Sequence, residues 1–99
     1  MTAEQTASID SLAQNFADTA MRILVKITPE LKLCLDRLEE VCEAMRKESK
    51  PRVDKMMEDT RKSPWLAQQL FQLAAMDVAQ AGKRKALEIV NEKENGNEN

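Results

Sequence analysis

The chain has 99 residues, of which 42% are hydrophobic and 3% aromatic, and its formal net charge at pH 7 is −2. A chain of this length forms one domain and buries only about 60 to 65% of the surface that it exposes when unfolded. Acidic and basic residues are interleaved, so the sequence provides no net positive field that would attract nucleic-acid phosphates. It also has no apolar run of about 18 residues, and "MTAEQTASID" does not resemble a signal peptide. We therefore expect a cytoplasmic or otherwise intracellular, reducing location and no membrane partner.

The composition indicates an all-α protein. Good helix formers dominate, and there are only two glycines. Two of the three prolines follow a hydroxyl residue, in Thr28-Pro29 and Ser63-Pro64, which is typical of an N-cap and the first position of a helix. The third, Pro51, follows Lys50 and predicts a break or a sharp kink after Ser49, because a residue before proline is disfavoured in the α conformation. The sequence leaves open whether the segments on either side form one kinked helix.

The first predicted helix covers residues 6–27. Its large apolar residues recur at helical spacing, with several alanines beside them. These apolar residues are Ile9, Leu12, Phe16, Ile23 and Ile27. The resulting apolar stripe is wider than a single neighbouring helix would cover.

The second predicted helix covers residues 29–49. Leu31, Leu35, Leu38, Val41 and Met45 follow one another at steps of four, three, three and four, which predicts a coiled-coil-like seam. The only two cysteines stand beside this seam, at positions 34 and 42. In one helix they lie about 12 Å apart along the axis, too far for a disulfide, so we expect free thiols that pack as small apolar side chains.

The last two predicted helices cover residues 51–62 and 64–91. The first is short, amphipathic and weakly held, and the second carries apolar residues along most of its length. Gly82 interrupts the second and marks either a fraying point or a close approach of another helix. Residues 92–99, "EKENGNEN", contain no apolar side chain. We therefore expect a disordered tail after a single domain of residues 1–91.

The sequence offers little support for catalysis or metal binding. With no histidine and two cysteines, the chain lacks the third and fourth thiolate or imidazole ligands of a typical structural zinc site. The acidic residues Asp36, Glu40 and Glu43 follow one helix face opposite the leucine seam, which is typical of a solvated face with ion pairs. A serine nucleophile lacks a histidine base, and two glycines do not make a phosphate-binding loop. We expect no enzymatic activity, metal or cofactor.

Two further features have alternative interpretations. The basic residues Lys83, Arg84 and Lys85 could contact phosphates, but without interleaved aromatic residues we favour a role near the negative end of a helix dipole. Trp65, the only tryptophan, is expected to pack under the preceding turn as an apolar anchor. The alternative is an exposed residue that contributes strongly to binding a partner.

These observations predict an antiparallel bundle of about four helices, or a pair of helical hairpins. Because the apolar stripes are wide, we expect a homo-oligomer, most simply a two-fold dimer that pairs the seam of residues 29–49 or of residues 64–91 with its copy. The candidate interface residues are Leu31, Leu35, Leu38, Met45, Trp65, Leu66, Leu70 and Phe71.

The predicted function is protein binding, by a small helical scaffold, adaptor or inhibitor that places a helix face against an unidentified protein. One alternative is a nucleic-acid-associated dimeric regulator that uses residues 83–85. Another is a small phage- or plasmid-type inhibitor of a host complex, which is compatible with the size and charge.

Overall fold

The computed structural model describes the backbone of residues 3–97 and the side chains of residues 14–96. Three long helices, α1 (Ala3–Ile27), α2 (Leu38–Lys62) and α3 (Ala67–Asn97), account for most of the chain. Three short 3-10 helices, η1 (Pro29–Leu33), η2 (Leu35–Arg37) and η3 (Pro64–Leu66), form the connections. Residues 3–97 contain no β-strand, so the predicted all-α class is confirmed, with three long helices in place of the four expected.

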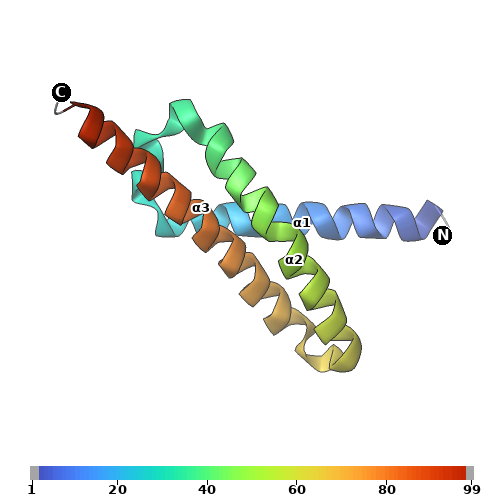
Figure 1. The fold of residues 1–99 in the computed structure, drawn as a ribbon. Helices are drawn as coiled ribbons and strands as arrows, with labels where there is room; N and C mark the ends of the chain where they lie inside the picture. The colour runs from blue at the N-terminus through green and yellow to red at the C-terminus, as the bar shows by residue number, and fades with distance from the viewer. Residues whose placement is uncertain (1–2, 98–99) are drawn as a thin grey trace.

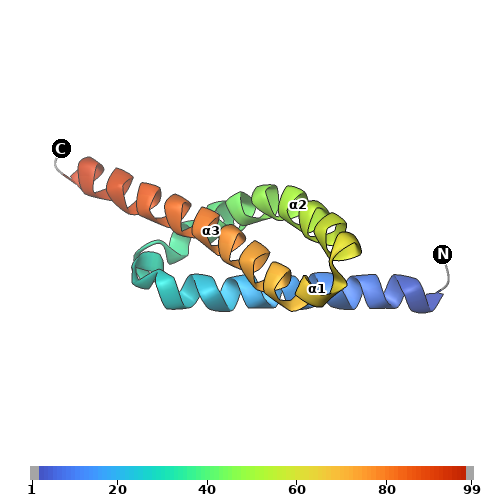
Figure 2. The same ribbon diagram turned by 90° about the horizontal axis from the view of Figure 1, so that it is seen from below.

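The helix α3 lies at the centre of the arrangement. It runs beside α2 as an antiparallel hairpin, and α1 crosses this hairpin as a separate layer (Figure 1, Figure 2). Within the part of the chain that the structure describes, α3 packs extensively on both α1 and α2, whereas α1 and α2 make few direct contacts with each other. The N-terminal end of α1 and the C-terminal end of α3 extend beyond α2 (Figure 1). The molecule measures 56 × 26 × 19 Å.

Pro51 does not break the helix, so of the two outcomes predicted after Ser49, a break or a sharp kink, the break is wrong. It lies inside α2, so the segments expected as helices 29–49 and 51–62 share one helix that begins at Leu38. An internal proline loses a backbone hydrogen bond and crowds the preceding turn, at a cost of about 3 kcal/mol. In α2 buried residues on both sides of the proline, Val41 and Met45 before it and Met56 after it, belong to the same core and hold the helix together.

Residues 29–37 form two 3-10 turns with a bend at Cys34, and not the start of an α-helix. A 3-10 helix has three residues per turn, so side chains there no longer follow the α-helical steps of the predicted seam. Cys34 is fully buried, whereas Leu35 is 62% exposed. The expected single helix holding both cysteines is therefore wrong, although both thiols are free as predicted.

Thr28 and Ser63 separate the long helices, but neither side chain caps a helix. Their backbone carbonyls accept hydrogen bonds from the N–H groups of Leu31 and Leu66, at 3.1 and 2.9 Å, and each opens a 3-10 turn. The Thr28 side chain is buried, and its hydroxyl makes no hydrogen bond in the structure. The sequence thus located the connections correctly, while the expected capping bonds are absent there.

Small side chains on α3 allow α1 and α2 to approach it closely. Ala75, Ala79 and Ala86 of α3 are fully buried. Larger core side chains come mainly from the neighbouring helices and include Phe16, whose ring packs edge-on against that of Phe71 with centroids 5.5 Å apart. Apolar burial of this kind is the main stabilising contribution in a domain with few aromatic residues.

Gly82 lies where the three long helices meet. A Cβ atom at this position would stand 2.9 Å from Cγ and Sδ of Met45 on α2 and 3.0 Å from Cδ1 of Leu24 on α1. Of the two alternatives that the sequence left open, the close helix approach is therefore the correct one. The absent side chain lets α2 and α1 pack on α3 at the same level.

The C-terminal residues continue α3 as far as Asn97, where the composition led us to expect a disordered tail, and residues 98–99 lie outside the described part. Polar side chains fix this end of α3 to the 3-10 turns. The guanidinium of Arg37 donates to Glu92 at 2.8 Å. Lys93 donates to the backbone carbonyl of Leu33 at 3.0 Å and to Asp36. These partners are 55 to 60 residues away in the chain, which is why local composition did not indicate them.

Filling the space at Gly82 is expected to destabilise the fold. The Gly82→Val variant places three carbons where even a Cβ is too close, and we expect a loss of about 2 kcal/mol in the free energy of unfolding, measured by urea denaturation. Adding Met45→Ala is expected to recover part of the loss, because the two sites are in contact.

The matched control is Gly96→Ala on the same helix, where an added Cβ meets open space. It is expected to leave stability unchanged or slightly increased. Equal losses at the two glycines would contradict the packing explanation.

Acidification is expected to loosen the contact between α3 and the 3-10 turns. The hydrogen bond from Lys93 lowers the pKa of Asp36, and Arg37 lowers that of Glu40. Carboxyl groups with lowered pKa values stabilise the fold fully above about pH 4 and lose this contribution as the pH falls through their folded-state values. As the pH is lowered from 5 to 2, the thermal midpoint of unfolding should decrease. The decrease should be less steep in the Lys93→Met variant.

The control for this experiment is Lys62→Met, which removes a different exposed ion pair, 3.4 Å from Glu58 within α2. It should keep the pH dependence of the unmodified protein, as followed by circular dichroism. An unchanged slope in Lys93→Met would exclude the contribution assigned to Asp36.

Candidate functional site

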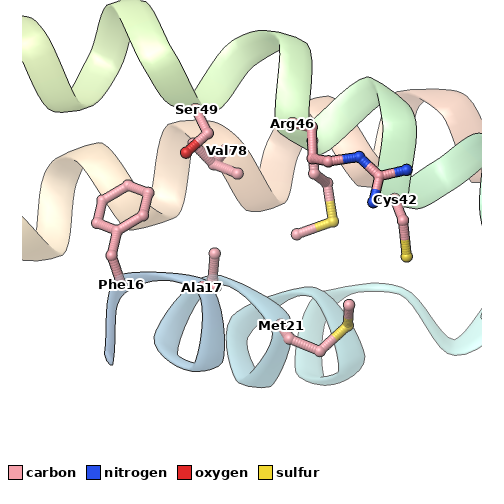
Figure 3. Close-up of a pocket in the computed structure, with 9 residues that line it drawn as sticks. Phe16, Ala17, Met21, Cys42, Arg46, Ser49 and Val78 are labelled. Carbon is pink, nitrogen blue, oxygen red and sulfur yellow. The ribbon is translucent and has the colours of Figure 1, made fainter. Parts of the chain in front are cut away.

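An open apolar groove lies between α1 and α2, with α3 beneath it. Its volume is about 190 Å³. The side chains that line it come from all three long helices and face one another across the opening (Figure 3). They are Phe16, Ala17, Ala20, Met21, Cys42, Met45, Arg46, Ser49 and Val78.

The groove follows directly from the helix arrangement. Both α1 and α2 pack on α3 while barely touching each other, so a channel remains along their facing sides. Ala17 and Ala20 on α1 stand one turn apart and widen the channel, because they bring no atoms beyond Cβ toward α2. Val78 of α3 contributes to the floor and is 3% exposed.

Arg46 forms a polar rim on the α2 side. Its guanidinium lies 2.9 Å from a carboxylate oxygen of Glu43 and 3.5 Å from one of Glu39, and these carboxylates raise the pKa of the guanidinium. The charged end is thus engaged along the outside of α2, and the aliphatic part of the side chain is available to the groove wall.

The groove is suited to binding apolar groups. Cys42 and Arg46 are the ionisable residues among the described lining residues, so the site lacks a paired acid and base. Within the described residues, no group of three or more cysteine or acidic side chains is placed to hold a metal ion. Met21 and Met45 have flexible side chains that can adapt to apolar side chains of different shapes.

The two cysteines have different environments. Cys34 is fully buried, its thiol donates to the carbonyl of Leu31 with a sulfur–oxygen distance of 3.4 Å, and burial raises the pKa of this thiol. Cys42 is half-buried and lines the groove. Only Cys42 of this pair therefore stands at a surface that a partner can reach.

The predicted interface residues do not form one surface. Met45 is buried and also lines the groove, and Leu31, Leu38, Leu70 and Phe71 are partly buried against the core. The exposed candidates are Leu35, Leu66 and Trp65, of which Trp65 is 76% exposed. The expected packing of Trp65 under the preceding turn is wrong, and the alternative of an exposed side chain is correct.

The basic stretch presents less positive surface than its sequence suggests. Lys85 lies 3.3 Å from Glu88, and Lys83 is half-buried, while Arg84 is exposed. Consecutive residues of an α-helix point about 100° apart, so the three cations do not share one face of α3.

The acidic residues that the sequence placed on a solvated face do take part in ion pairs. Asp36 pairs with Lys93, Glu40 with Arg37, and Glu43 with Arg46. Exposed pairs of this type contribute little to stability individually. Their arrangement supports the structural interpretation of these carboxylates.

Sequence reasoning missed the groove because it depends on how α1 and α2 are placed on α3. The available signal was the pair of small residues Ala17 and Ala20 within an apolar stripe, which indicates a helix surface that another element can approach. The cysteine assigned to a seam edge, Cys42, belongs to this groove.

Comparisons of the chain with protein-family models, curated proteins and solved structures gave no match. Among the described residues, no helix combines the length and the apolar character needed to cross a membrane.

Thiol labelling should separate the two cysteines. In the native protein, a water-soluble thiol reagent is expected to modify Cys42 readily and Cys34 only when the fold opens, because the Cys34 side chain has no exposed surface. The measurement is the rate of each modification by mass spectrometry, with Cys42→Ala as the control that should remove the fast phase. Fast labelling of Cys34 in the folded protein would contradict its burial.

Proposed function

We propose that this protein is a small helical protein-binding module, and that the groove between α1 and α2 receives apolar side chains of a partner. The observation that supports this proposal is an open groove with an almost entirely apolar lining drawn from three helices. Exposed apolar surface of this kind costs free energy in water and is typical of interaction sites.

The chemistry of the lining favours a protein partner over a small metabolite. Sites for small molecules combine apolar walls with several polar groups that fix the orientation of the ligand. Here the polar groups are limited to the rim, at Arg46 and Ser49, and two methionines form part of the walls. An amphipathic helix that inserts one or two apolar side chains would match this groove.

This activity fits a scaffold, adaptor or inhibitor that acts by occupying the surface of another protein. The two free thiols, one of them in the groove, fit a reducing intracellular compartment, where an accessible cysteine stays reduced. The spread of the cations at residues 83–85 around α3 gives the nucleic-acid alternative no comparable surface.

A charge in the groove is expected to abolish partner binding. Ala17 is exposed and lines the groove, so Ala17→Glu adds a carboxylate to the apolar wall at little cost to the fold. The control is Asn15→Glu, an exposed position on the same helix outside the groove lining. Affinity capture with the three proteins should recover partners with the unmodified chain and with Asn15→Glu, and lose them with Ala17→Glu.

The labelling rate of Cys42 gives a second readout of the same experiment. A captured partner that occupies the groove should slow the labelling of Cys42 by at least tenfold. Partners that bind equally to Ala17→Glu, or that leave Cys42 labelling unchanged, would show that the groove is not the binding site.

A further inference from the structure

A second apolar surface lies on the side of α3 that faces away from the core, and we call it the outer face of α3. Its residues recur at steps of three and four along the helix, as in a coiled-coil seam. They are Gln69, Leu73, Met76, Gln80, Arg84 and Leu87, all exposed, and the exposed Leu66 of η3 lies one turn before them. Leu73 is 58% exposed and Met76 is 49% exposed, whereas their neighbours Ala74 and Ala75 are buried. The helix α3 is thus apolar on two sides, of which the chain itself covers one.

The outer face starts in a segment without charge. No aspartate, glutamate, lysine or arginine occurs from Ser63 to Met76, in a chain of which 32% is charged. The exposed polar residues of this segment include three glutamines, Gln68, Gln69 and Gln72. Depletion of charged residues, together with exposed tryptophan and methionine, is characteristic of the central part of protein interfaces.

The α1 layer extends this surface. Ile23 of α1 lines a shallow groove together with Leu73, Met76 and the three glutamines of α3. The groove lies on a different side of α1 from the channel at Ala17 and Ala20, because Ile23 is absent from the lining of that channel. The two surfaces are therefore separate and can be tested independently.

The chain exposes enough surface for a stable dimer. Its accessible area is 7038 Å², compared with about 5,700 Å² for a compact monomer of the same mass. Its radius of gyration is 16.0 Å, compared with about 13 Å for a compact chain of this length. The excess of about 1,300 Å² belongs to the whole elongated chain, and a two-fold dimer that buries the roughly 800 Å² per partner of a standard interface would remove part of it.

We propose that a second copy of this chain covers the outer face of α3, in a two-fold dimer that pairs α3 with its counterpart. In such a dimer the same face meets itself, so a charged face would meet its own charge. The part of the outer face up to Met76 carries no charge and avoids this repulsion. The glutamine amides carry both donors and acceptors, so they can hydrogen-bond to identical amides across the axis. Gln69 and Gln80 stand among the apolar residues of this face, and polar residues in such a seam fix the register of paired helices.

The experiment compares two leucines that are equally exposed. Leu73→Glu places a carboxylate on the outer face, and Leu33→Glu places one on η1, where the leucine is 59% exposed. Absolute mass is measured by light scattering behind a sizing column over a hundredfold range of concentration. We expect about twice the chain mass of 11.2 kDa for the unmodified protein and for Leu33→Glu, and the monomer mass for Leu73→Glu.

A second variant guards against loss of folding. Gln69→Glu changes an exposed polar residue and should also produce a monomer, because it adds one negative charge per copy to the uncharged part of a face that meets itself. Circular dichroism must show unchanged helicity in all variants. Trp65 fluorescence should shift to longer wavelength on dilution of the unmodified protein and be independent of concentration in Leu73→Glu.

Three results would overturn the proposal: a monomer mass for the unmodified protein at every concentration, a dimer that persists in both outer-face variants, or dissociation by Leu33→Glu to the same extent as by Leu73→Glu. None of these bears on the groove between α1 and α2, whose test uses Ala17→Glu. The two proposals can therefore fail separately.

Discussion

The structure depends on the close approach of α1 and α2 to α3 around Gly82. Leu24 and Met45 pack against a position without a side chain, so both neighbouring helices reach α3 at one level. Fully buried alanines along α3 extend this contact in both directions. Because small residues on α3 determine how near its neighbours lie, they also set the width of the groove that α1 and α2 enclose. The core and the candidate site therefore have a common physical origin.

Features of the fold that depend on local sequence could be predicted. Features that depend on contacts between distant residues could not. The all-α class and the connections at Thr28 and Ser63 follow from local composition and spacing. At Gly82 local sequence left two alternatives, and the packing of Leu24 and Met45 decides between them. The continuity of α2 through Pro51 does not follow from local sequence, since it depends on the core that its two halves share with α3. The helical end of α3 likewise depends on Arg37 and Lys93, whose partners are far away in the sequence.

The candidate site was less predictable than the fold. Periodicity identified the residues that are apolar, but it could not identify which apolar side of α3 the chain covers by itself. Phe71 faces the core and Leu73 faces solvent, although both belong to the same wide stripe. Their separation follows from the direction in which α1 crosses the hairpin, and no local signal encodes that direction. Cys42 was placed correctly beside apolar neighbours, but the helix that stands opposite it could not be inferred.

The scarcity of contacts between α1 and α2 has an energetic consequence. Within the described chain, α1 is held to the hairpin mainly through α3, and its direct contact with α2 is small. A molecule that occupies the channel touches both helices and adds contacts between them. By linkage, its affinity then depends on how firmly α1 is docked, and its binding in turn holds α1 in place. The stabilisation that such a molecule would give to α1 and the gain in its affinity when α1 is docked are one coupling free energy.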